Sequence, residues 1–352
     1  MLKFEIFEKF DENCFKIFDA LSHGSNYNFF QSYDYLKKFS LENKSEIKII
    51  AISKNEKLIA ILPLEIKKYF FFKVLQWIGT HRSDLCNPIL IKNFDNFVDK
   101  KNFKLLWNDI LESIGDYDLI FLNNQIEKIG ESFNPFTQHL ESVKFSKIYQ
   151  ILLPDNFEEY LEDQKHKDKK KYYEIHRTLL KAEKLKKNFN VSFHVEKFPE
   201  NKVNFREIIK NKIKQLNSKK IRNNLDENFI KLFDYLIKNN NSKFLLIDLN
   251  VENKNISSCF GILLNDVFYY YIPMIVSNDY NNYKPGKILI LNIIDWCIKN
   301  KVKIFDFGLG DEKYKENFSN QSLALYRFTK HKSFLGKILL IVIKTIFFYK
   351  NI

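Results

Sequence analysis

The most informative part of the chain is the stretch from Asp279 to Lys315, which reads DYNNYKPGKILILNIIDWCIKNKVKIFDFGLGDEKYK. Its middle predicts a helix from Lys287 to Asn300, in which nine of the fourteen residues are apolar and lie on every side of the helix. A strand from Lys303 to Phe307 follows. Because a helix that is apolar all round is usually buried, we expect its N-terminus to be held firmly.

The loop before this helix carries the first group of candidate site residues. A proline followed by a glycine lets the backbone turn and approach a ligand closely. The first N–H groups of a helix lack internal partners and carry the positive end of the helix dipole, so they suit a phosphate or pyrophosphate. The candidate binding residues are Tyr283, Lys284, Pro285, Gly286 and Lys287. An ordinary strand-to-helix turn is the alternative, and a Walker-type phosphate loop is excluded because its glycine spacing is absent.

The loop after the strand carries the second group. Two glycines allow a sharp turn there, and carboxylates, a tyrosine and a lysine lie close by in the sequence. Such a loop at the end of a strand can place a general base and a proton donor opposite a substrate. The candidate catalytic residues are Asp306, Asp311, Tyr314 and Lys315, with Tyr283 as a second candidate proton donor. The sequence does not identify which carboxylate is the base, and an exposed polar turn is the alternative.

The rest of the 352-residue chain divides into two α+β units of similar order. In the first, an apolar helical pattern precedes an antiparallel hairpin, two further strands, a helix and a strand. In the second, a long basic helix from Phe157 to Asn188 and two shorter helices precede three strands and the stretch quoted above. We therefore predict a mixed α+β fold with an N-terminal domain at 1–150, a C-terminal domain at 151–332 and an apolar C-terminal helix at 333–352.

The charge of the chain is strongly positive, with a formal net value of +13. An anionic partner is the first expectation. Arginine, which commonly reads bases and phosphates with two donors, is scarce, so we favour a generally basic surface over sequence-specific nucleic-acid binding. The basic stretch Lys165–Lys187 is either a solvated helix face or a surface for CoA phosphates, a tRNA, or an anionic sugar or lipid headgroup.

The tail from Phe334 to Tyr349 is very apolar but is interrupted by Lys337 and Lys344. It is shorter than the ~20 apolar residues that a membrane-spanning helix needs. It predicts a helix docked on the protein, with a helix lying on a membrane surface as the alternative. The beginning of the chain has no apolar signal core, so we expect a cytoplasmic protein with a possible peripheral contact to the inner face of the cell membrane through residues 334–349.

Metal and disulfide chemistry find no support in the spacing of the relevant residues. The four cysteines are far apart, and the seven histidines show no paired motif. We expect no metal site and no disulfide framework.

Several segments together resemble a known family. The pattern Y-x-x-x-K-P-G before an apolar helix, then I-F-D-F-G-L-G-D-E-K-Y-K, is similar to the signature of the CelD/BcsL-like acetyltransferases, a branch of the GNAT superfamily related to the FemAB-like transferases. Phe29-Phe30-Gln31-Ser32, Ile61-Leu62-Pro63-Leu64 and the turn from Gly79 to Asp84 also resemble segments of that family. The resemblance covers about residues 25–330. This sequence departs from the superfamily pattern in one place, because its pyrophosphate loop contains a single glycine, Gly286.

The resemblance implies two tandem GNAT-like units, each a mixed, mainly antiparallel sheet flanked by helices. It also implies an acyltransferase that moves an acyl group from acyl-CoA, acetyl-CoA first, to an amine of a sugar or of a polysaccharide or cell-envelope precursor. The acyl donor would bind near Tyr283–Ile288, and the amine would attack the thioester directly, beside the strand Val267–Ile272. Two alternatives stay open: a FemAB-like aminoacyl transferase that uses aminoacyl-tRNA, and a non-catalytic scaffold at a membrane surface.

Overall fold

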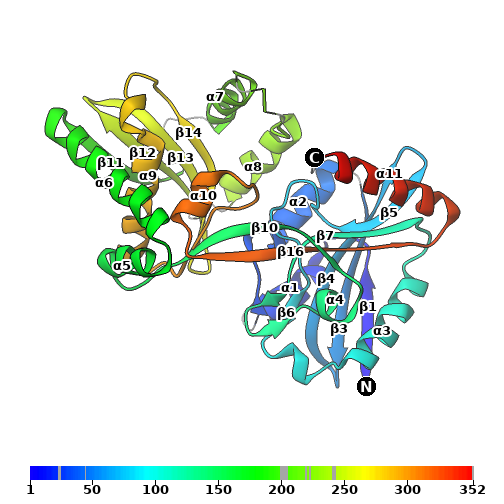
Figure 1. The fold of residues 1–352 in the computed structure, drawn as a ribbon. Helices are drawn as coiled ribbons and strands as arrows, with labels where there is room; N and C mark the ends of the chain where they lie inside the picture. The colour runs from blue at the N-terminus through cyan, green and yellow to red at the C-terminus, as the bar shows by residue number, and fades with distance from the viewer. Residues whose placement is uncertain are drawn as a thin grey trace. The chain divides into compact units, whose positions relative to one another are not determined.

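The chain forms two compact units in the computed structural model, which describes residues 1–22, 25–43, 45–198, 205–218, 220–221, 223–239 and 243–350. Unit 1 comprises Met1–Ser146 and Ala324–Ile352, and unit 2 comprises Lys147–Leu323 (Figure 1). The chain passes between the units within two long strands, β10 (Val143–Leu152) and β16 (Gln321–His331). The last strand and the C-terminal helix thus return to unit 1. Of the predicted tail 333–352, the last two residues lie outside the described residues.

Unit 1 is a mixed sheet with helices packed on it. The main strands lie in the order β1 (Leu2–Phe7), β3 (Glu46–Lys54), β4 (Lys57–Tyr69), β5 (Phe72–Trp77), β7 (Leu119–Ile126) and β16. The short strand β6 (Ile89–Ile91) pairs with β4 and with β2 (Ser25–Asn26), and β8 (Lys128–Ile129) and β9 (Ser132–Phe133) form a separate small hairpin. The helices are α1 (Glu12–Ser22), α2 (Tyr33–Asn43), α3 (Lys100–Ser113), α4 (Pro135–His139) and α11 (Phe334–Lys350). Strands β5 and β7 run parallel, whereas β1, β3, β4 and β5 pair antiparallel.

Unit 2 repeats this plan. Its strands lie in the order β10, β15 (Ile304–Asp306), β14 (Val267–Ile275), β13 (Lys254–Leu264), β12 (Phe244–Val251) and β11 (Val191–Lys197), and only β14 and β15 among these pair in parallel. The helices are α5 (Phe157–Lys167), α6 (Lys169–Asn188), α7 (Phe205–Ser218), α8 (Glu227–Asn239), α9 (Pro285–Lys299) and α10 (Lys313–Phe318). The predicted mixed fold is confirmed.

Helix α9 is the central helix of unit 2. Nine of its residues are buried, and it packs against β12, β13 and β14, so the expectation of a buried helix is confirmed. Its apolar side chains join those of the strands in one hydrophobic core that also includes Tyr160, Ile175 and Phe318. Burial of this surface, at roughly 25 cal/mol per Å², stabilises the element whose N-terminus carries the first group of candidate residues.

The predicted single helix from Phe157 to Asn188 is wrong in one respect, because the chain breaks it at Asp168. The Asp168 side chain accepts hydrogen bonds from the backbone N–H groups of Lys170 and Lys171, at 2.9 and 3.3 Å. Asp168 is therefore the N-cap of α6, and an aspartate in this position starts a new helix because its oxygen satisfies backbone donors that lack an internal partner.

Helix α11 is fastened to unit 1 at its beginning. The backbone carbonyl of Asp118 accepts from the N–H groups of Lys332 and Ser333, and the Asp118 carboxylate accepts from the Ser333 hydroxyl at 2.5 Å. Gly336 lies so close to Asp118 that an added Cβ would stand 1.8 Å from the Asp118 carbonyl oxygen. The helix approaches the start of β7 closely only because residue 336 has no side chain. Across the described residues, we find no helix long and apolar enough to cross a membrane.

The Gly336→Ala substitution should release α11 from unit 1. The new methyl group would collide with a backbone carbonyl, which cannot move aside as a flexible side chain can, so we expect a loss of about 1–3 kcal/mol in the stability of helix docking. Amide hydrogen exchange at 334–343 should accelerate about tenfold or more. Thr345→Ala, at an exposed position of the same helix, is the control and should leave exchange unchanged. Unchanged protection in Gly336→Ala would contradict this account of the contact.

Candidate functional site

Two parallel strands of unit 2 separate at the centre of the candidate site. β14 and β15 pair only at Val267 with Ile304, Phe268 with Phe305 and Tyr269 with Asp306. β15 ends at Asp306, while β14 continues to Ile275. The remaining part of β14 therefore borders a place where the sheet opens on the β15 side, which is where ligands commonly bind between parallel strands.

A β-bulge lies immediately beyond the last paired residue of β14. Phe260 of β13 pairs with Ile272 and Ile262 pairs with Tyr269, so two residues of β14, Tyr270 and Tyr271, lie opposite Gly261. A Cβ on Gly261 would stand 2.5 Å from the Phe268 ring, which explains the glycine. Bulges redirect the backbone and occur frequently next to active sites. The glycine within a strand was the sequence signal for this bulge, and the prediction missed it.

The beginning of α9 follows the end of β14 and is partly open to solvent. Lys284 is the exposed N-cap residue, in the left-handed conformation with φ of 61°, and Pro285 is buried. The N–H groups of Lys287 and Ile288 donate to the Lys284 carbonyl, at 2.9 and 3.3 Å. Because Pro285 has no N–H, the amide of Gly286 is the main donor that this helix end presents, rather than three equivalent amides.

Helix α6 borders both groups of candidate residues, since it contacts α9, α10 and the turn Asn281–Tyr283 before α9. The Lys181 ammonium donates to the Asn282 carbonyl at 2.7 Å, and the ring of Phe189, just after α6, packs edge-on against Tyr283 at 6.2 Å between centroids. Lys287 of α9 forms an ion pair with Glu174 of α6 at 3.1 Å. The basic helix that the sequence left without an assigned role therefore lies beside the site.

The Glu174–Lys287 pair is expected to make the stability of unit 2 depend on pH. The hydrogen bond from Lys287 is the largest cause of the lowered pKa of Glu174. A carboxyl group with a lowered folded-state pKa stabilises the protein above its ordinary pKa, and this stabilisation is lost as the pH falls through the folded value. Glu174→Gln should therefore lower the free energy of unfolding near pH 7, by less than about 1 kcal/mol because both side chains are partly exposed.

Urea unfolding measured near neutral pH and at about pH 3 checks this expectation. The difference between the wild-type protein and Glu174→Gln should shrink at the acidic pH, because Glu174 loses its charge as the pH falls through its lowered pKa. Glu183→Gln, at an exposed position of the same helix, is the control and should have no effect at either pH. A difference that persists unchanged in acid would show that the ion pair does not contribute.

Asp306 is buried at the end of β15. One carboxylate oxygen accepts from the Gln150 side-chain amide at 2.7 Å, and the other accepts from the backbone N–H of Gly308 at 2.6 Å. Burial raises the pKa of Asp306, while these two hydrogen bonds and the charge of Lys315 act in the opposite direction. The structure thus places Asp306 inside the protein, holding the turn of the loop to β10.

The other three candidate catalytic residues lie in or next to α10. The Lys315 ammonium is buried, pairs with Glu312 at 2.9 Å and donates to the carbonyl of Leu309, so it closes the loop on itself. Tyr314 is half-buried, and burial is the main cause of its raised pKa. Tyr314 and Tyr270 of the bulge both pack against the ring of Phe307, at 6.2 and 5.8 Å between centroids. Asp311 is exposed.

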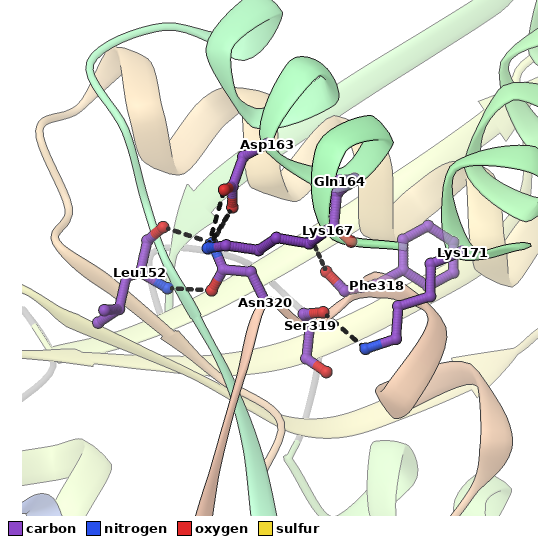
Figure 2. Close-up of polar contacts among 8 residues, drawn as sticks. All are labelled: Leu152, Asp163, Gln164, Lys167, Lys171, Phe318, Ser319 and Asn320. Carbon is purple, nitrogen blue, oxygen red and sulfur yellow. Dashed lines mark hydrogen bonds and ion pairs between the residues drawn. The ribbon is translucent and has the colours of Figure 1, made fainter. Parts of the chain in front are cut away.

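A network of polar contacts fixes the end of α10 to α5 and β10, and Figure 2 shows it. The Asn320 side chain accepts from the N–H of Leu152 at 2.9 Å and donates to the Leu152 carbonyl at 3.0 Å. It also donates to Asp163 at 3.1 Å, and Asp163 forms an ion pair with Lys167 at 2.8 Å.

The last carbonyl groups of α10 accept hydrogen bonds from side chains of α5 and α6. The Phe318 carbonyl accepts from the Tyr160 hydroxyl at 2.9 Å. It also accepts from Gln164 at 3.4 Å, and the Ser319 carbonyl accepts from Lys171 at 3.3 Å (Figure 2). Because helix ends leave carbonyls without internal partners, these contacts stabilise a helix of only six residues. They position Tyr314 in a rigid frame, and no sequence pattern indicated them.

The structure brings the two predicted groups into one region of unit 2. Tyr283 from the first group and Tyr314 from the second both pack against the hydrophobic core that contains α9, and α6 contacts the elements that carry them. Asp306 and Lys315 are internal, whereas Lys284 and Asp311 are exposed. No group of three or more side chains that could hold a metal ion occurs within the described ranges.

A comparison with family models identifies part of this unit. Residues 169–316 match the model described as "Acetyltransferase (GNAT) domain". The match covers less than half of the chain and contains α6, the bulge, α9 and all residues of both candidate groups. Unit 2 carries a GNAT-type acyltransferase domain. The prediction of an acyltransferase is confirmed at this level, and the CelD/BcsL branch is not resolved by the match.

Solved structures show the same fold over nearly the whole chain. The crystal structure of FemX superposes with a TM-score of 0.60 at 9% identity and covers 93% of this chain and 97% of its own. The structure of L-PGS from Bacillus licheniformis gives a TM-score of 0.51 at 12% identity, with 96% and 98% covered. A tandem GNAT protein from the clavulanic acid biosynthesis pathway gives 0.51 at 6% identity, with 95% and 99% covered. No curated protein matches the chain significantly. These likenesses support two tandem GNAT-like units.

Proposed function

We propose that the GNAT domain of unit 2 binds an acyl-CoA, acetyl-CoA first, and transfers the acyl group to an amine of a sugar or of a cell-envelope precursor. The observation that carries the proposal is the coincidence, at one point of β14, of the end of its pairing with β15 and the bulge at Tyr270–Tyr271. A strand that opens there can lie along an extended pantetheine arm and offer it backbone hydrogen bonds.

The phosphates of the donor would lie at the beginning of α9. The Gly286 amide and the positive end of the α9 dipole favour an anion there. Lys284 is exposed at the N-cap, and Lys181 of α6 donates to the turn that precedes it, so two further positive charges lie close by. Tyr283 and Pro285 shape the turn. Lys287 is held by Glu174 and orients α9 rather than pointing freely to a ligand.

The chemistry of the transfer needs no nucleophile from the protein, because the thioester supplies the activated acyl group. A backbone N–H at the bulge, at Tyr270 first, would stabilise the negative charge that develops on the acyl oxygen, an effect worth about 3 kcal/mol. Tyr314 would hold the proton that the departing thiolate needs, and its raised pKa keeps that proton in place at neutral pH.

The remaining two acids and the lysine divide into different roles under this proposal. Asp311 is exposed on the loop and is our candidate to accept the proton of the attacking amine. Asp306 and Lys315 would act as positioning residues, since their polar atoms are engaged inside the loop. The resemblance to CelD/BcsL-like acetyltransferases supports an acceptor from polysaccharide or cell-envelope synthesis.

Aminoacyl-tRNA is the second candidate donor, and it is supported by the likeness to FemX and by the basic helix α6 beside the site. Aminoacyl-tRNA is the donor of FemAB-like transferases, and the lysines of α6 would then contact the nucleic acid through its phosphates. Lys169 and Lys170 are exposed at the start of this helix.

Isothermal calorimetry with acetyl-CoA tests the proposed function. We expect saturable binding with one site per chain, and a gel shift with charged tRNA should show no complex at about 150 mM salt. The reverse pattern, a salt-sensitive tRNA complex that Lys169→Glu with Lys170→Glu abolishes and no binding of any acyl-CoA, would overturn acyl-CoA as the donor.

A further inference from the structure

The exposed side of α11 is apolar, although it faces away from unit 1. The exposed large residues of this helix are Phe334, Leu335, Ile338, Ile341 and Val342, and Phe334 is 76% exposed. At 100° per residue these positions fall within one face about 120° wide. Gly336, which is buried, and the partly buried Leu339 and Ile343 lie on the opposite face. A helix docked on a globular protein ordinarily has a polar outer face. The outer face of α11 is instead apolar, and it is exposed rather than packed against unit 1.

The turn between β4 and β5 adds a second apolar element to the same region. Phe70 is 91% and Phe71 is 66% exposed, and Phe70 lies in the left-handed conformation with φ of 55°. The Phe71 ring packs against Phe72 at 4.3 Å between centroids, but most of the surface of both exposed rings lies in contact with solvent. The Phe70 and Phe71 rings lie at the tip of a tight turn, a position from which they can insert into the apolar part of a lipid bilayer.

Asp118 joins these two elements. The N–H of Lys73, two residues beyond Phe71, donates to the Asp118 carboxylate at 2.8 Å, and the Ser333 hydroxyl donates to the other oxygen of the same carboxylate. α11 also contacts both β5 and β7. The start of the helix and the base of the hairpin tip therefore lie side by side in unit 1, as Figure 1 shows for α11 and β5.

The charges around the two apolar elements are positive. The sequence contains no Asp or Glu after Glu316, and Lys330, Lys332 and Lys337 are exposed. The segment 66–73 carries three lysines and no acid. Of the neighbouring acids, Asp118 is engaged as described and Asp116 is exposed.

We propose that α11 and the Phe70–Phe71 turn form one docking surface for an anionic lipid bilayer, on which α11 lies in the plane of the interface. An apolar helix face flanked by lysines is the pattern of a helix that lies on such a surface. Each lysine near an anionic leaflet adds to the attraction. A second copy of the chain suits this surface less, because it would bring two sets of lysines together. The inference is independent of the acyl donor.

Sedimentation of the full chain with lipid vesicles tests this proposal. We expect binding to phosphatidylcholine vesicles with about 30% phosphatidylglycerol, little binding to phosphatidylcholine alone, and release when the salt rises from about 50 to about 500 mM. Phe70→Asn with Phe71→Asn should lower the bound fraction about fivefold or more. Asparagine suits the left-handed position, so the hairpin should fold normally.

Two matched controls separate insertion and charge from a general loss of binding. Leu105→Asn with Val143→Asn also removes two exposed apolar side chains of unit 1 and should leave binding unchanged. Lys68→Glu with Lys337→Glu should abolish the preference for the anionic vesicles, whereas Lys101→Glu with Lys104→Glu on α3 should retain it.

Three results would overturn the proposal. The first is that the folded chain binds neither kind of vesicle, and the second is that the Leu105/Val143 control loses as much vesicle binding as the Phe70/Phe71 variant. The third is a dimer in analytical ultracentrifugation that dissociates in the Phe70/Phe71 variant. The last result would assign the surface to a second copy of the chain.

Discussion

Acetyl-CoA binding should weaken by about a hundredfold or more in the Gly286→Trp variant. Gly286 follows Pro285 at the beginning of α9, and its amide is the main donor that this helix end presents. An indole side chain at this position would fill the space in front of the amide and exclude a phosphate from it. Burial of the first turn is limited, since Gly286 is partly exposed, so the large side chain can extend into solvent without unfolding the helix.

A graded substitution distinguishes occlusion from misfolding. In Gly286→Ala the added Cβ would stand 2.9 Å from the end of the Ile275 side chain, which can move by rotation about its own bonds. We therefore expect Gly286→Ala to retain affinity within about threefold and Gly286→Trp to lose it, with both variants unfolding within a few degrees of the wild-type protein. Wild-type affinity in the tryptophan variant would remove the helix end from the binding site.

The second large effect is expected for Tyr314→Phe. This substitution should lower the rate of CoA release about 10²- to 10³-fold with glucosamine as the test acceptor, while the affinity for acetyl-CoA changes less than about twofold. The reason is that the phenol is the proposed proton donor, and the ring, which packs against Phe307, is retained. Because burial raises the pKa of Tyr314, we also expect no loss of rate from its deprotonation as the pH rises to about 9.

The tyrosines of this region provide the comparison. Tyr173→Phe, at an exposed position of α6, should leave the rate unchanged. Tyr283→Phe tests the other candidate donor, whose hydroxyl accepts from Asn188 at 3.3 Å. A large loss in Tyr283→Phe together with a wild-type rate in Tyr314→Phe would transfer the proton-donor role from α10 to the turn before α9.

Much of the fold could be predicted from local patterns. The apolar runs of α9, β3 and β4 each specify an element without help from distant residues. The break at Asp168 was missed because the helical pattern continues on both sides of it, and only the capping geometry reveals the new start. Strand β10 was missed because what fixes it lies far along the chain, as in the pairing of Gln150 with Asp306.

The candidate site was predictable in composition but not in geometry. The sequence indicated a helix N-terminus and an acidic loop. It did not indicate how many backbone N–H groups at the start of α9 can bind a ligand, because this number depends on the left-handed conformation of Lys284 and on the hydrogen bonds to its carbonyl. Likewise, the sequence alone does not distinguish Asp306 from Asp311. In the structure Asp306 is buried and both of its carboxylate oxygens accept hydrogen bonds, whereas Asp311 is exposed. The bulge results from the pairing of β13 with β14, so only the glycine at 261 indicated it.

The most direct test of the central claim is the electron density of crystals soaked in CoA. We expect a phosphate oxygen within about 3 Å of the Gly286 backbone nitrogen, with the pantetheine arm running along β14 toward Tyr270. Density for CoA elsewhere on the chain, or none at a saturating concentration, would contradict this claim.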